Sequence, residues 1–176
     1  MDFATSPQIE LNRETNWPSV LAFVRDYWQA KRGSRAMPRR NDISPAELKT
    51  QLPQLLLADV IENGADFRYR LVGSGLRAFF RSDPSGRLLS EIIAPFGSTT
   101  LEATLQAYRS VVVQRAPMRL TGGGAWFGQK AKLFDAYLAP LSDNGTDPNM
   151  LLGTFVFEWD RDMQFQPLLS AWSLAQ

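Results

Sequence analysis

Hydrophobic residues return with a helical period between Trp17 and Trp28, where they form one stripe along the segment. Pro18 suits the first turn of a helix, and Gly33 is expected to end it. Such a stripe has to be covered, either by the sheet of its own chain or by a partner chain.

A second helical period runs over residues 98–114, where Thr99 and Glu102 have the spacing of a capping box. A capping box also occurs at residues 44–47, and it predicts a short helix that stops near Pro53. Residues 73–93 read as two short helical pieces.

Alternating hydrophobic and polar positions predict strands in the remaining segments. Residues 54–62 and 66–72 flank Asn63-Gly64, a strong hairpin signal. Three further strands are expected near the end of the chain, at 117–121, about 126–139 and 150–159. Strands in blocks separated by helices predict an α+β protein, with helices packed on one face of an antiparallel sheet.

The composition excludes several classes of chemistry. The chain of 176 residues contains no cysteine and no histidine. It therefore has no disulfide, thiolate metal site, cysteine-linked flavin, histidine-ligated haem or serine–histidine–aspartate triad. We expect no metal site and no catalytic residues, and the composition leaves any cofactor unknown. The net charge of +1 makes nucleic-acid binding an unfavoured interpretation.

Residues 31–40 carry five cations in ten positions: Lys31, Arg32, Arg35, Arg39 and Arg40. A solvated loop is the favoured interpretation, and binding of an anion or nucleic acid is the alternative. No apolar run is long enough to span a membrane, and the first residues do not resemble a signal peptide, so we expect a cytoplasmic protein without membrane contact.

The segment from Gly73 to Ala78 spells G-x-G-x-x-A, a pattern found in dinucleotide-binding proteins. That motif requires a parallel βαβ unit, whereas the strand before it here is the second arm of a predicted hairpin. Asp83-Pro84 also breaks the following helix too early. We therefore interpret the glycines as permitting a turn between strand and helix.

Three stretches resemble segments of the PAS-domain superfamily: 67–74 (FRYRLVGS), 82–89 (SDPSGRLL) and 138–145 (LAPLSDNG). The chain is most similar to the bacterial single-domain variety, in which a helical arm precedes the core. The resemblance implies a five-stranded antiparallel sheet with helices on one face. Residues 1–53 would be the arm and basic entry loop, 54–159 the PAS-like core and 160–176 a tail.

The resemblance also implies a sensory or regulatory function through protein contacts, through a non-covalent small molecule between helices and sheet, or through both. The side chains predicted to bind such a ligand are Phe79, Phe80, Ile92, Tyr108, Met118, Trp126, Phe134 and Tyr137. An ordinary hydrophobic core is the alternative interpretation of these residues. A signalling protein such as a sensor kinase is the expected kind of partner.

The helical arm predicts an interaction surface and a homodimer. Its residues are Trp17, Leu21, Val24 and Trp28. Asp135 is the unusual polar residue of an apolar strand, and we expect it to face solvent and pair across strands. The alternative function is an enzyme that uses Asp135 or Asp59 with Tyr137 for acid–base chemistry.

Overall fold

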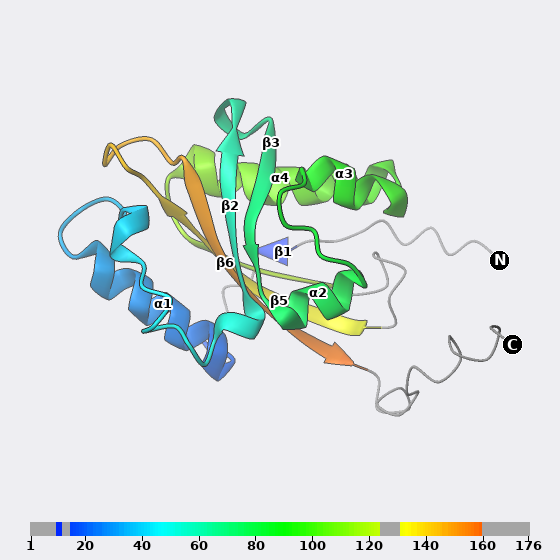
Figure 1. Ribbon diagram of the computed structural model, residues 1–176, viewed down its shortest axis with the longest axis horizontal. Helices are drawn as coiled ribbons and strands as arrows, with labels where there is room; N and C mark the ends of the chain where they lie inside the picture. Colours follow the sequence, from blue (N-terminus) through cyan, green and yellow to red (C-terminus); the bar gives the residue numbers. More distant parts are fainter. Residues whose placement is uncertain (1–9, 12–14, 124–130, 160–176) are drawn as a thin grey trace, which may run out of the picture.

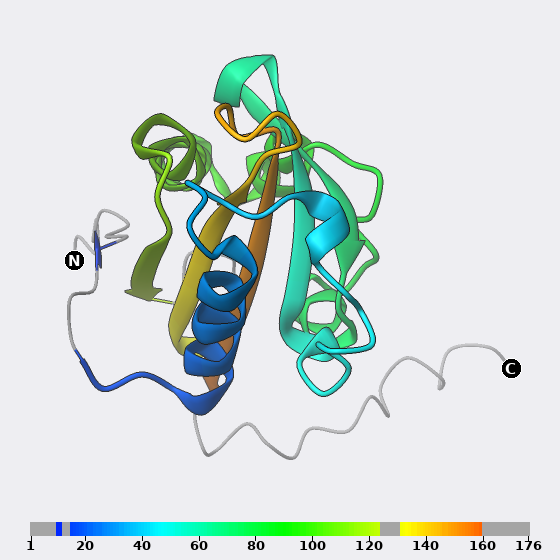
Figure 2. The same cartoon turned by 90° about the vertical axis from the view of Figure 1, so that its left-hand side faces the viewer.

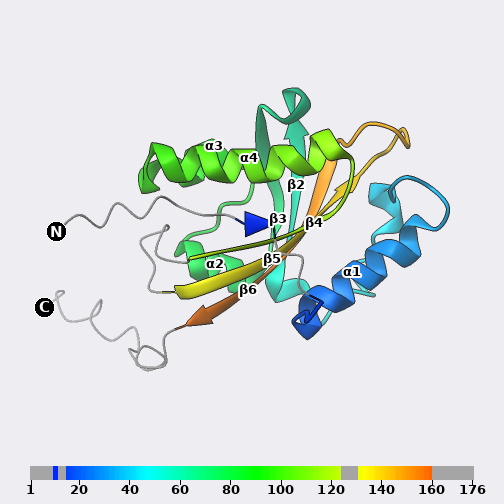
Figure 3. The same ribbon diagram turned by 180° about the vertical axis from the view of Figure 1, so that it is seen from behind.

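The computed structural model describes residues 10–11, 15–123 and 131–159, and an antiparallel sheet lies at its centre (Figure 1). The strand order is β1-β4-β5-β6-β2-β3, and β2 to β6 are the five predicted strands. The strands are β1 (Glu10–Leu11), β2 (Leu55–Ile61), β3 (Asp66–Val72), β4 (Met118–Gly123), β5 (Ala131–Leu141) and β6 (Met150–Trp159). The short strand β1 pairs with the edge of β4 (Figure 3).

All neighbouring strands of the described sheet run antiparallel. The predicted hairpin of β2 and β3 is confirmed, because the two strands pair antiparallel. The connection is longer than a two-residue turn, because residues 62–64 form a single 3-10 turn. Glu62, Asn63 and Gly64 all have positive φ angles there, of 45°, 57° and 98°.

Four α-helices accompany the sheet in the described parts of the chain. They are α1 (Ser19–Arg32), α2 (Ser74–Phe80), α3 (Leu89–Ile93) and α4 (Ser98–Gln114). The two short pieces predicted within residues 73–93 are therefore confirmed. The predicted cap of the last helix is wrong: α4 begins at Ser98, after Gly97 with a φ of 102°, and no side chain caps it.

Helices cover both faces of the sheet, as Figure 2 shows for α1 lying in front of β5 and β6. Helices α2, α3 and α4 cover the other side. Alternate residues of β5 separate the two layers: Phe134 and Leu138 pack under α4, whereas Tyr137 and Ala139 pack under α1. We call these sides of the sheet the α4 face and the α1 face.

The arm helix packs on the sheet of its own chain. Leu21, Val24 and Trp28 of α1 are fully buried in the hydrophobic core of the α1 face. The indole Nε1–H of Trp28 also donates a hydrogen bond of 2.9 Å to the carbonyl oxygen of Pro140 in β5. The hydrophobic stripe of the arm is thus covered within the chain.

The short helix predicted from residues 44–47 is wrong, since only hydrogen-bonded turns follow Ser44 before a 3-10 helix at Leu52–Gln54. The side chain of Glu47 does not complete a capping box. It accepts a hydrogen bond from the Tyr27 hydroxyl at 2.7 Å and pairs with Lys31. These contacts hold the segment against α1, and they engage the carboxylate that the predicted capping box would have used.

Gly73 lies where β3 passes into α2, and its φ of −63° is ordinary for any residue. A Cβ at this position would lie 2.1 Å from the carbonyl oxygen of Leu52 and 2.4 Å from that of Pro53. The glycine is required by close backbone packing and not by a left-handed turn, which corrects the interpretation of the G-x-G-x-x-A pattern.

Candidate functional site

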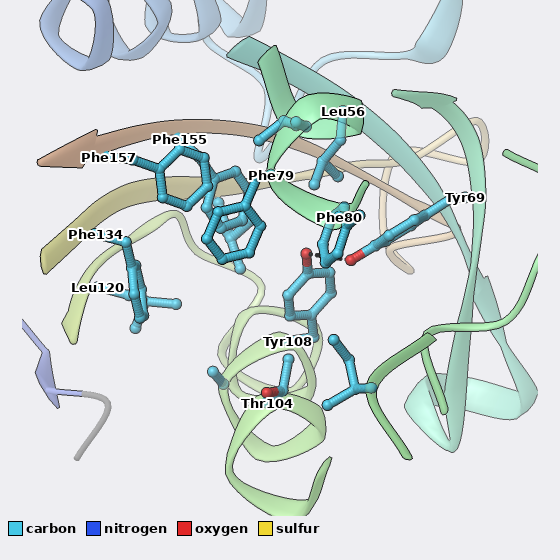
Figure 4. A pocket seen from close by; sticks show the side chains of 14 residues that line it. Leu56, Tyr69, Phe79, Phe80, Thr104, Tyr108, Leu120, Phe134, Phe155 and Phe157 are labelled. Carbon is cyan, nitrogen blue, oxygen red and sulfur yellow. Dashed lines mark hydrogen bonds between the residues drawn. The ribbon is translucent and has the colours of Figure 1, made fainter. Parts of the chain in front are cut away.

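A cavity of about 40 Å³ lies between α2, α4 and the α4 face of the sheet (Figure 4). A water molecule needs roughly 10–15 Å³ on the same measure, so the cavity has room for about three water-sized groups. Its lining residues are Leu56, Tyr69, Leu76, Phe79, Phe80, Ile93, Thr104, Ala107, Tyr108, Leu120, Phe134, Leu138, Phe155 and Phe157.

The cavity lining is hydrocarbon apart from three hydroxyl groups. The Thr104 hydroxyl donates to the carbonyl oxygen of Thr100 at 2.7 Å, inside α4. The other two belong to Tyr69 of β3 and Tyr108 of α4, whose oxygens lie 3.1 Å apart in a hydrogen bond. The lining includes no charged side chain.

The tyrosine pair stays neutral over a wide range of pH. Both side chains are buried, and burial raises the pKa of the Tyr69 phenol and of the Tyr108 phenol above the ordinary value of 10. Figure 4 shows the two phenol oxygens meeting beside Phe80, among the lining side chains. The pair therefore offers hydrogen bonds to a ligand and no charge.

Aromatic rings form one wall of the cavity. Phe79 of α2 stacks on Phe157 of β6, with ring centroids 4.2 Å apart and planes inclined by 10°. Phe80 meets Phe79 edge to face at 5.3 Å, and Phe155 stacks alongside Phe157. Such a wall accepts flat or compact apolar molecules.

Four of the eight predicted ligand-binding residues line this cavity: Phe79, Phe80, Tyr108 and Phe134. Ile92 and Met118 belong to the same hydrophobic layer without lining the cavity. Trp126 lies outside the described residues.

Tyr137 is on the opposite side of the sheet from these residues, packed under α1. The reason is strand parity, because Phe134 and Tyr137 are an odd number of residues apart in β5 and point to opposite faces. The sequence reasoning missed Tyr69, Phe155 and Phe157. Their alternation with polar neighbours in β3 and β6 was the available signal.

The four residues of the predicted interaction surface hold α1 to its own sheet. Leu21, Val24 and Trp28 are buried, and Trp17 is half-buried with two guanidinium groups near its ring. Those of Arg25 and Arg119 lie 4.7 Å and 4.8 Å from its ring centroid. The stripe is therefore not an exposed contact surface while α1 is docked.

Asp135 is paired across strands, as expected, and the pair is largely buried. Arg119 of β4 donates to both carboxylate oxygens, from Nε at 3.0 Å and from Nη2 at 2.6 Å. The side chains are 4% exposed for Arg119 and 19% for Asp135, so the expectation that Asp135 faces solvent is wrong. Asp59, the other proposed acid, pairs with Arg70.

Two buried hydroxyl groups under α1 have no hydrogen-bond partner among the described residues: those of Tyr137 in β5 and Thr154 in β6. The two residues face each other in the antiparallel pairing of these strands. Burial raises the pKa of the Tyr137 phenol. The α1 face thus contains polar groups that neither the sheet nor α1 satisfies.

Two of the five cations in the basic segment 31–40 pair with carboxylates. Lys31 pairs with Glu47 at 2.7 Å, and Arg35 pairs with Asp42 at 2.8 Å. Arg32 lies over the ring of Trp28, and Arg40 donates to a backbone carbonyl. These contacts favour the solvated-loop interpretation over an anion site.

Within the described residues, no group of three or more acidic side chains is placed to hold a metal ion. None of the helices described is both long and apolar enough to cross a bilayer. A family model described as a PAS domain matches residues 17–156, which include α1 and most of the sheet. No curated protein matches the chain.

Proposed function

Because the chain belongs to the PAS-domain family, we propose that it is a sensory or regulatory module that acts by protein contacts and is gated by a small molecule. The family supports a sensory or regulatory role in general. The observation that carries the finer proposal is the cavity between α4 and the sheet. It is apolar, it lies inside the fold, and its lining contains the Tyr69–Tyr108 pair as a polar anchor.

The strand β5 gives a physical route from this cavity to the surface helix. Its residue Phe134 lines the cavity, while Tyr137 and Ala139 lie under α1 on the other side of the same strand. A ligand that moves Phe134 therefore acts on the packing beneath α1. In this proposal the position of α1 is the output that a partner protein reads.

The homodimer, a signalling partner such as a sensor kinase and the cytoplasmic location stay predictions. With α1 docked, a dimer has to use residues other than Leu21, Val24 and Trp28. Phe23, on the outer side of α1, is 43% exposed and is available for such a contact.

The acid–base enzyme alternative is less well supported by the geometry. Its carboxylate, Asp135, is held by Arg119, and its tyrosine, Tyr137, is packed under α1. Neither residue lines the cavity, and the lining carries no other acid. The anion-binding alternative loses support because Lys31 and Arg35 already pair with Glu47 and Asp42.

Native mass spectrometry of the intact purified chain tests gating by a resident molecule. We expect a non-covalent adduct that is released on denaturation. Ala107→Leu places a larger side chain from α4 into the cavity, so this variant should lose the adduct. Tyr137→Phe, on the α1 face, is the matched control and should keep it. An intact chain without adduct, or an adduct that Ala107→Leu does not weaken, contradicts the proposal.

A further inference from the structure

The tyrosine pair of the cavity has one more proton than its hydrogen bond uses. Each phenol carries one hydroxyl proton, and the 3.1 Å bond between Tyr69 and Tyr108 takes up one of the two. The described residues supply no acceptor for the other. Both side chains are at most 3% exposed, so bulk water does not readily supply one. A buried donor without an acceptor is unfavourable by an amount comparable to a lost hydrogen bond.

The other lining residues restrict the kind of molecule that can supply the missing acceptor. Thr104, the third lining hydroxyl, already donates to Thr100 inside α4. No lining side chain carries a charge that would balance an ionic ligand, and an unpaired ion in an apolar site is strongly disfavoured. Everything else around the cavity is hydrocarbon or aromatic ring.

From this arrangement we infer that the cavity selects compact, uncharged molecules of mainly hydrocarbon character with one acceptor oxygen, as in a small ketone, aldehyde or ester. The oxygen takes the remaining proton of the Tyr69–Tyr108 pair. The hydrocarbon part lies against the aromatic wall of Phe79 and Phe157. This inference rests on the proposed function and adds the chemical class of the ligand to it.

A matched pair of probes tests the inference: acetone and isobutene, which carry an oxygen and a CH₂ group at the same place beside two methyl groups, about the number of water-sized groups that the cavity holds. Their affinities are measured by NMR titration of the intact chain. The informative quantity is the ratio of the ketone affinity to the hydrocarbon affinity, because it cancels the packing that the two probes share.

The decisive variant is Tyr69→Phe/Tyr108→Phe, which removes both phenols and leaves the ketone oxygen without a donor. We expect the ketone-to-hydrocarbon ratio to fall roughly tenfold relative to the unchanged chain. Each single variant keeps one phenol and its proton, so both should retain the preference. A loss caused only by altered packing would lower the affinity for the hydrocarbon as well.

Tyr137→Phe is the control, since it removes an equally buried phenol from the α1 face, and it should leave the ratio unchanged. Three results overturn the inference: neither probe binds, the double variant keeps the ratio, or each single variant loses as much as the double. Probe binding reports the chemistry of the cavity, whereas the mass spectrum reports whether a molecule resides there. The two proposals can therefore fail separately.

Discussion

The α4 face and the α1 face are built from the same strands, but they differ in the hydrogen bonding of their buried hydroxyl groups and in the volume left between side chains. Under α4, the hydroxyls of Tyr69 and Tyr108 are paired with each other, and volume remains beside them. Under α1, the hydroxyls of Tyr137 and Thr154 are buried with no hydrogen-bond partner in the part of the chain that the structure describes.

This difference suits the α4 face to binding a ligand, whereas on the α1 face the helix α1 covers the sheet. A cavity beside a tyrosine pair with one unused hydroxyl proton is suited to a ligand, because the ligand adds contacts without breaking the hydrogen bond between the two phenols. Unpartnered hydroxyls under α1 lower the stability of its docking, which agrees with the proposal that a partner reads the position of α1. The partially buried pair of Arg119 and Asp135 is the strongest polar feature of the α1 face.

The largest effect is expected from Asp135→Ala on the α1 face. The substitution removes the carboxylate to which the buried guanidinium of Arg119 donates two hydrogen bonds. We expect the free energy of unfolding to fall by about 3 kcal/mol, as is typical when one member of a buried pair is removed. Chemical denaturation measures this loss, which should persist in high salt because buried charges are weakly screened.

The double variant Arg119→Met/Asp135→Leu controls for the charge. Replacing both members by apolar side chains should recover most of the stability. Arg77→Ala breaks an exposed pair with Asp83 and should change stability by less than about 0.5 kcal/mol. A loss for Arg77→Ala equal to that for Asp135→Ala would show that burial does not distinguish the two pairs.

An intermediate effect is expected from the same enlargement made on each face. Ala139→Leu adds three carbons to β5 beneath α1, where Ala139 is fully buried and lines no cavity that we identify. It should lower the free energy of unfolding by about 2 kcal/mol through overpacking. Ala107→Leu adds the same atoms beside the cavity and should stay within about 0.5 kcal/mol of the unchanged chain. Thermal melts and denaturation curves compare them, and equal losses would contradict the difference between the faces.

The sequence predicted β2 to β6 from local signals, whereas β1 was not predicted. Alternation marks β3 and β6, and Asn63-Gly64 marks the hairpin. The capping box at Ser44–Glu47 failed for a tertiary reason: Tyr27 and Lys31 of α1 take the Glu47 carboxylate that would have capped the helix. A local pattern does not reveal a competing partner that lies elsewhere in the chain.

The candidate site was predictable only in part, because β5 is apolar on both sides. Phe134 and Leu138 alternate with Tyr137 and Ala139, so burial alone does not tell which set faces the helices that enclose the cavity. That ambiguity put Tyr137 among the predicted lining residues. The cavity itself had no signal in the sequence, since its volume depends on how side chains from α2, α3, α4 and the five strands β2 to β6 meet.

The smallest effect, and the sharpest comparison, comes from removing one phenol oxygen on each face. Tyr108→Phe breaks a buried hydrogen bond and should lower the free energy of unfolding by about 1 kcal/mol. Tyr137→Phe removes a hydroxyl that has no partner, so it should raise the same quantity by up to about 1 kcal/mol.

Thr154→Val provides an independent check on the α1 face, because it removes the second unpartnered hydroxyl with little change of shape. It should also leave stability equal or higher, as judged by urea denaturation of all three variants beside the unchanged chain. The two tyrosine variants are expected to change the free energy of unfolding in opposite directions because the Tyr108 oxygen is hydrogen-bonded and the Tyr137 oxygen is not. Burial does not explain the difference, since both tyrosines are buried to a similar extent. A loss of stability in both tyrosine variants would mean that the Tyr137 hydroxyl is hydrogen-bonded in solution, and the contrast between the faces would then rest on the cavity alone.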